Sequence, residues 1–148
     1  MKRVRTMIFC FFLSLSSCSE QATECGRFCT EEFRTIAVSV ENQEGDPVAL
    51  DSYRVINLDN GREITPDLSP DELQQMREQG RYPIINDSYI EEYRKQELNL
   101  EFTGLLGGEE VVTENYKVGF DCCHVYHIAG DLELVLNNPP QSSFYPRG

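Results

Sequence analysis

The arrangement of the cysteines restricts the fold of this chain more than any other feature of its sequence. The 148 residues include six cysteines, and two of them are adjacent in the segment FDCCHVYH, residues 120–127, which also contains His124 and His127. Such a cluster can be a metal site, a redox centre or one half of a disulfide framework. Thiols oxidise outside the cytoplasm and stay reduced inside it, so the compartment of folding decides between these interpretations.

The start of the chain predicts export. Residues 1–5, MKRVR, are basic, and an apolar run of about nine residues follows at 7–15, which is the order and length of a signal peptide. A membrane-spanning helix takes about twenty apolar residues, so this run is too short to cross a bilayer. No later segment has even ten apolar residues in a row, and we therefore expect no integral membrane protein.

The leader ends in Leu15-Ser16-Ser17-Cys18, which resembles the lipobox of bacterial lipoproteins. The resemblance implies a signal peptide over residues 1–17, cleavage before Cys18 and attachment of lipid to the Cys18 thiol. Residues 19–20 do not resemble the aspartate signal that retains enterobacterial lipoproteins at the inner membrane, so an outer-membrane location in the cell envelope is expected. An ordinary secretory signal with a chance cysteine would still export the chain.

The charge of the processed chain limits its partners. Loss of residues 1–17 removes three of thirteen basic residues and none of the twenty-five acidic ones, so the formal net charge falls from −12 to −15. Nucleic acid and anionic lipid surfaces attract basic proteins, so neither is an expected partner. The membrane contact must then come from the N-terminal lipid, and an envelope protein or a glycan remains a possible further partner.

Hydrophobic alternation predicts a mainly β fold. Ile36, Val38 and Val40 alternate with small or polar residues, which is the period of a half-buried strand. Asn60-Gly61 predicts a tight hairpin. Further extended segments are expected at 48–58, 62–65, 82–85, 97–103, 111–113, 116–128 and 131–136. About seven short strands separated by turns favour an antiparallel β-sandwich, which is an Ig-like architecture.

One short helix is predicted at residues 70–79. Ser69 is a suitable N-cap, Glu72 completes a capping box, and Gly80 stops the helix. Its apolar stripe consists of Leu73 and Met76 alone, which indicates a surface helix inserted between strands. Residues 89–94 fit either a helical turn or an edge strand. The expected organisation is a lipidated tether with two cysteines at 18–32, a β-sandwich domain at 33–137 and a C-terminal tail at 138–148.

The opening of the domain carries a second resemblance. The strand at 35–40, the turn at 44–48 and the segment 53–55 resemble the start of carboxypeptidase-regulatory-like, transthyretin-like β-sandwich domains. The chain also resembles small lipoproteins of the Bacteroidetes that carry such a domain. The resemblance covers about a quarter of the processed chain, while the helix and the adjacent cysteines depart from it. It implies a non-catalytic module.

Four cysteines remain once Cys10 leaves with the leader and Cys18 carries lipid: Cys25, Cys29, Cys122 and Cys123. If 116–128 is one strand, Phe120, Cys122, His124, Tyr126 and Ile128 share the core-facing side and Cys123 and His127 lie nearer the rim. A bond between Cys122 and Cys123 would strain the peptide between them. We therefore expect at least one cross-link from Cys25 or Cys29 to Cys122 or Cys123, and two such cross-links would require a bulge or a strand end.

The alternative is a zinc or copper site. Its ligands would be Cys25, Cys29, Cys122, Cys123, His124 and His127. The spacing lacks the C-x-x-C pair of structural zinc sites, so we expect no metal or other cofactor, a hydrogen-bonded core His124 and a solvated His127. No C-x-x-C leads from a strand into a helix as in redox enzymes.

No catalytic motif was found, including G-x-S-x-G and H-E-x-x-H. The sequence therefore predicts a lipid-anchored binding or structural module that is not an enzyme. A metal-binding protein is one alternative, and a small hydrolase with an unidentified nucleophile is the other.

Overall fold

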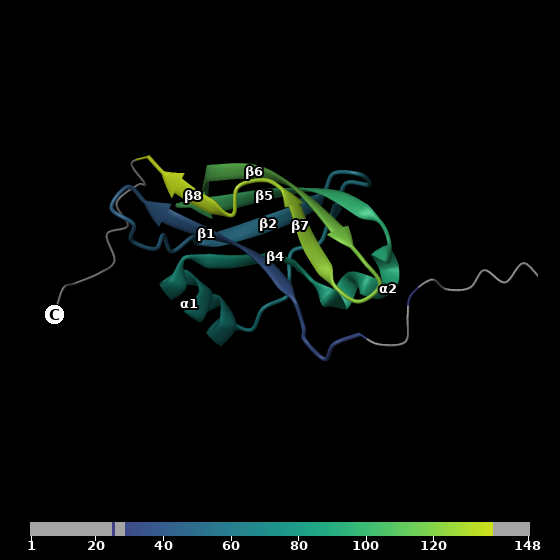
Figure 1. Ribbon diagram of the computed structural model, residues 1–148. Coiled ribbons are helices and arrows are strands. Elements are labelled where there is room, and N and C mark those ends of the chain that lie inside the picture. The colour runs from purple at the N-terminus through teal and green to yellow at the C-terminus, as the bar shows by residue number, and fades with distance from the viewer. Residues whose placement is uncertain (1–24, 26–28, 138–148) are drawn as a thin grey trace, which may run out of the picture.

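The computed structural model describes residue 25 and residues 29–137 (Figure 1). The predicted signal peptide, the lipidation site Cys18 and the tail at 138–148 lie outside the described residues. The elements, in chain order, are β1 Thr35–Asn42, β2 Ser52–Asn57, β3 Arg62–Glu63, α1 Pro70–Gln79, β4 Arg81–Asn86, the 3-10 turn η1 Asp87–Tyr89, α2 Ile90–Tyr93, β5 Glu97–Leu106, β6 Glu109–Phe120, β7 Val125–Ala129 and β8 Glu133–Leu136.

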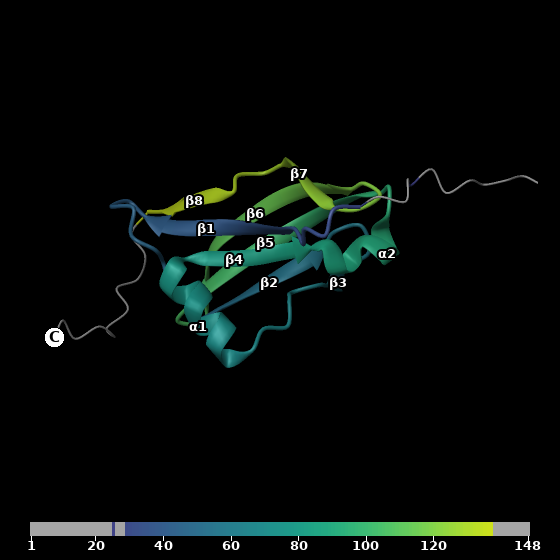
Figure 2. The same ribbon diagram turned by 60° about the horizontal axis from the view of Figure 1, so that its bottom comes forward.

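Two sheets form the layers of the predicted β-sandwich (Figures 1 and 2). One has the strand order β4-β1-β8, and the other has the order β3-β2-β5-β6-β7. Neighbouring strands are antiparallel except β1 and β8, which run parallel. The parallel pair arises because the chain returns from β7, at the edge of one sheet, to the edge of the other sheet beside β1. The mainly β sandwich is confirmed.

The core lies between the two sheets. The alternating side chains Ile36, Val38 and Val40 of β1 are buried, as their period predicted, and the facing sheet contributes Leu100 and Phe102. Tyr82 is fully buried, and its hydroxyl donates to the carbonyl of Val48 and accepts from the N–H of Leu50, each at 2.7 Å. A buried hydroxyl with partners avoids the desolvation penalty of an unpaired one.

Helix α1 has the predicted bounds. The Ser69 side chain accepts from the Glu72 N–H, and the Glu72 carboxylate accepts from the Ser69 N–H, which completes the capping box. Gly80 ends the helix in the left-handed conformation, with φ of 61°. No residue of the helix is buried, so α1 is the surface helix that its narrow apolar stripe indicated.

In two regions the strand bounds differ from those predicted, and in a third the structure decides between the two predicted alternatives. The predicted strand at 116–128 is two strands, because a turn at 121–124 separates β6 from β7. The segment at 111–113 is part of β6, and β5 continues to Leu106, so the chain turns at Gly107-Gly108. Residues 89–94, for which two structures were possible, are helical up to Tyr93.

The segment before β1 enters the sandwich at the end where α2 and the β6–β7 turn lie, as Figure 2 shows. The 3-10 turn after β4 reaches the same end, since the Asp87 N–H donates to the carbonyl of Arg34 at 3.0 Å. Three distant parts of the sequence therefore meet there. Among the residues that the structure describes, no helix has the length and apolar character needed to cross a membrane.

Candidate functional site

The cysteine pair lies in a tight turn. The Asp121 carboxylate accepts from the N–H groups of Cys123 and His124 at 2.6 and 2.7 Å, and the Asp121 N–H donates to the carbonyl of His124 at 3.0 Å. These backbone hydrogen bonds lower the pKa of Asp121, because they stabilise its charged form. An aspartate that binds the N–H two residues ahead is the mark of an Asx-turn, and it breaks the predicted strand.

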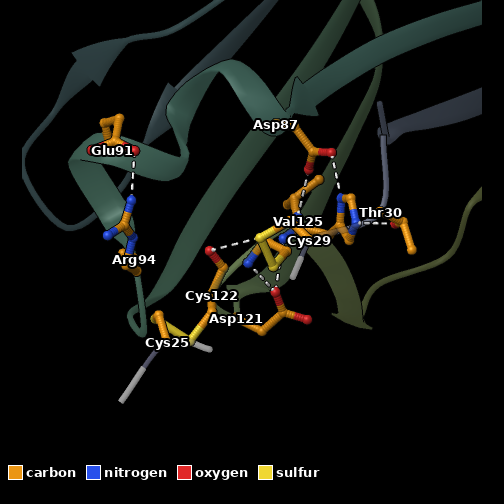
Figure 3. The surroundings of a disulfide bond; sticks show 11 residues. Cys25, Cys29, Thr30, Asp87, Glu91, Arg94, Asp121, Cys122 and Val125 are labelled. Atoms are coloured by element: carbon orange, nitrogen blue, oxygen red, sulfur yellow. Dashed lines mark hydrogen bonds and ion pairs between the residues drawn. A yellow bond between two sulfur atoms is a disulfide. The ribbon is translucent and has the colours of Figure 1, made fainter. Parts of the chain in front are cut away.

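Two disulfides attach the N-terminal segment to this turn (Figure 3). Cys25 bonds to Cys122 and Cys29 to Cys123, with Cα–Cα distances of 5.1 and 5.3 Å, which are ordinary for disulfides. The expectation of at least one cross-link is therefore confirmed, since two are present and Cys122 and Cys123 are not bonded to each other. Adjacent cysteines can both reach the same segment because the turn frees them from the alternating directions of a regular strand.

His124 is buried between two hydrogen-bonding partners. Its ring Nδ1 lies 2.8 Å from Asp87 Oδ2, and its Nε2 lies 2.8 Å from the Thr30 hydroxyl oxygen. The side chains of His124 and Asp87 are each only 8% exposed, whereas Thr30 is exposed. The prediction of a hydrogen-bonded core His124 is confirmed.

Asp87 is fixed by the backbone of both neighbouring strands. Its carboxylate accepts from the Arg34 N–H at 2.7 Å, next to the start of β1, and from the Val125 N–H at 2.7 Å, the first residue of β7. Burial opposes ionisation of Asp87, but the hydrogen bonds from His124, Arg34 and Val125 outweigh it, and its pKa is lowered. Asp87 is therefore a carboxylate at neutral pH.

The negative charge of Asp87 determines which ring nitrogen of His124 carries a proton. A carboxylate only accepts hydrogen bonds, so Nδ1 of His124 carries a proton and donates it to Asp87. In the neutral imidazole Nε2 then has a free lone pair and accepts from the Thr30 hydroxyl. With the ring in this neutral form, Thr30 donates to His124 and His124 donates to Asp87, which makes a continuous chain of hydrogen bonds.

An open hollow of about 440 Å³ lies beside this chain. It is lined by Cys29, Thr30, Arg34, Asp121, Cys122, Cys123 and His124. The Arg34 guanidinium pairs with Glu32 at 3.1 Å, and both side chains are about half exposed. Exposed pairs of this kind contribute little, so the guanidinium can exchange Glu32 for another anion.

The metal-site alternative is not supported. The four sulfurs are bonded to one another and are not free thiolates. Both ring nitrogens of His124 have protein partners, and His127 Nε2 lies 2.9 Å from the carbonyl oxygen of Gly130. Over residue 25 and residues 29–137, no group of three or more metal-binding side chains converges.

The predicted faces of the 116–128 segment were wrong in part. Phe120 and His124 are buried as expected, and His127 is exposed as expected. Cys122 is only half-buried, and Tyr126 and Ile128 point outward, because the turn shifts the alternation between β6 and β7. Sequence reasoning also missed Thr30 and Asp87. The only local signal was Asp87 following the strand β4, and nothing in the sequence linked it to His124.

Comparisons of the chain with protein-family models, curated proteins and solved structures found no match.

Proposed function

We propose that this chain is a lipid-anchored protein of the cell envelope whose β-sandwich is a binding or structural module. The two disulfides, Cys25–Cys122 and Cys29–Cys123, are the main observation in support of this proposal. The first of them begins at Cys25, seven residues after the lipobox cysteine Cys18. Stable disulfides belong to exported proteins, which agrees with the leader and the lipobox.

The disulfides shorten the connection between the proposed anchor and the domain. Seven residues span at most about 25 Å when extended, whereas the full tether at 18–32 could reach about 50 Å. A force on the anchor then passes through Cys25 into the β6–β7 turn, and β1 is not pulled from the sheet. The arrangement holds the domain close to the membrane surface.

Exposed apolar side chains on two edge strands support a binding role. Val135 on β8 is 56% exposed, and Tyr126 and Ile128 on β7 are 42% and 39% exposed. Strands β7 and β8 are each the last strand of their sheet. Edge strands present unpaired backbone groups, and apolar side chains beside them favour contact with a partner. An envelope protein or a glycan is the proposed partner.

Replacement of Cys18 tests the anchor. The Cys18→Ser chain cannot form the thioether to lipid, so we expect it to move from the membrane fraction into the soluble fraction of the native cell. Cys10→Ser is the matched control, because Cys10 lies within the leader, and it should stay with the membrane. A Cys18→Ser protein that remains bound to membranes would contradict the proposed anchor.

In-cell photo-cross-linking tests the binding surface. A benzoylphenylalanine placed at position 135 on β8 should give a discrete cross-linked product, whereas the same residue at position 78 on α1 should give none. Glu78 is the matched control because it is also exposed but lies on the surface helix. Equal products from both positions, or none from position 135, would argue against a partner at the β8 edge.

A further inference from the structure

We propose that Thr30, His124 and Asp87 form a hydrolytic site for small carboxylic esters in the hollow beside the disulfides. This activity goes beyond the binding or structural role. It also supplies the nucleophile that the sequence patterns did not reveal.

The three side chains contact one another in the order of a catalytic triad: Thr30 as nucleophile, His124 as base and Asp87 as the carboxylate that orients the base. The Thr30 hydroxyl lies 2.8 Å from Nε2 of His124, and Nδ1 of the same ring lies 2.8 Å from Asp87. Both distances fall within the range that proton transfer requires. The two backbone N–H groups on Asp87 hold the carboxylate in place, so the imidazole keeps the tautomer that accepts the Thr30 proton.

The disulfide next to the site holds Thr30 close to His124. The Cys29–Cys123 bond joins the residue directly before Thr30 to the residue directly before His124. Thr30 is exposed while His124 and Asp87 are buried, so a substrate in the hollow meets the hydroxyl first. Such a fixed arrangement lowers the entropy cost of bringing the reacting groups together.

Arg34 lines the same hollow and places a positive charge beside it. Its guanidinium can leave the exposed pair with Glu32 and stabilise the negative charge that develops on a carbonyl oxygen. The open hollow, of about 440 Å³, suits a small acyl group.

The reaction needs only the ester and water. The Thr30 oxygen attacks the carbonyl carbon as its proton moves to Nε2 of His124, and the bond to the leaving alcohol oxygen then breaks. The alcohol takes the proton from His124 and departs, leaving an acyl ester on Thr30. Water attacks this ester and gives a proton to His124, the acid leaves, and the proton returns to the Thr30 oxygen.

Labelling and hydrolysis test the proposal on the full exported chain in detergent. A fluorophosphonate should add to Thr30, located by mass spectrometry, and p-nitrophenyl acetate should be hydrolysed. Thr30→Val keeps the shape without the hydroxyl, and it should lower the rate at least about 100-fold. Thr30→Ser should retain the rate and the labelling, while Thr113→Val, an exposed threonine on β6, should change neither.

Intact mass shows whether each variant keeps both disulfides, which separates loss of activity from loss of folding. The proposal is overturned if the natural chain neither reacts with the probe at Thr30 nor hydrolyses the ester above buffer. It is also overturned if folded Thr30→Val hydrolyses the ester at the natural rate. In either case the three side chains only hold the N-terminal segment to the turn.

Discussion

Removal of both disulfides is expected to destabilise the protein far more than the two separate removals together. The bond between Cys25 and Cys122 spans 97 residues, and a loop of that length contributes about 5 kcal/mol in the chain-entropy model. Once it is closed, the bond between Cys29 and Cys123 closes a ring of only about seven residues, which contributes about 2 kcal/mol. Either bond alone can therefore supply the larger contribution.

The paired variants Cys25→Ala/Cys122→Ala and Cys29→Ala/Cys123→Ala should each lose about 2 kcal/mol of unfolding free energy. The variant lacking all four cysteines should lose about 7 kcal/mol, which is comparable to the whole stability of many domains. Urea unfolding at one pH and temperature measures these differences. Losses that simply add would contradict the shared loop, and so would a small loss in the fourfold variant.

Replacement of Asp87 is expected to have the next largest effect. Asp87→Ala removes the acceptor of the Arg34 N–H, which is exposed, and of the Val125 N–H and the His124 ring, which belong to buried residues. Leaving the donors of Val125 and His124 unsatisfied costs about 1 to 3 kcal/mol each. The pKa of Asp87 is lowered in the folded state. The stabilisation is therefore fully present above the ordinary carboxyl pKa, and it is lost as the pH falls from that value through the lowered pKa of the folded state.

Asp71→Ala is the matched control for Asp87→Ala. Asp71 is an exposed carboxylate in the first turn of α1, and its loss should change the unfolding free energy by about 0.5 kcal/mol or less. Urea unfolding at neutral pH compares the two variants. Equal small losses would show that the Asp87 hydrogen bonds are not a main source of stability at this end of the sandwich.

Local patterns in the sequence predicted most of the fold. The alternation at 35–40 identified β1, and Ser69, Glu72 and Gly80 identified the bounds of α1. These predictions succeeded because the period and the caps depend on neighbouring residues alone. The prediction of one strand at 116–128 was wrong. The extended pattern runs on through 121–124 in the sequence, whereas the hydrogen bonds of Asp121 bend the backbone there.

The candidate site was predicted only in part. The cysteine count and the predicted export signal led to the expectation of cross-linking, because oxidation depends on the compartment and not on exact geometry. The approach of Thr30, Asp87 and His124 could not be predicted, since these residues lie before β1, directly after β4 and in the β6–β7 turn. Their meeting depends on the sandwich topology and on the disulfide next to Thr30.

The disulfide pairing is measured in protein isolated from its native cell, with free thiols blocked at lysis. We predict that Cys25, Cys29, Cys122 and Cys123 all escape alkylation until a reductant is added. A Cys25→Ala/Cys122→Ala chain should still protect Cys29 and Cys123, as the observed pairing requires. Alkylation of all four cysteines without reductant, or a bond between Cys122 and Cys123, would contradict the pairing of Cys25 with Cys122 and of Cys29 with Cys123.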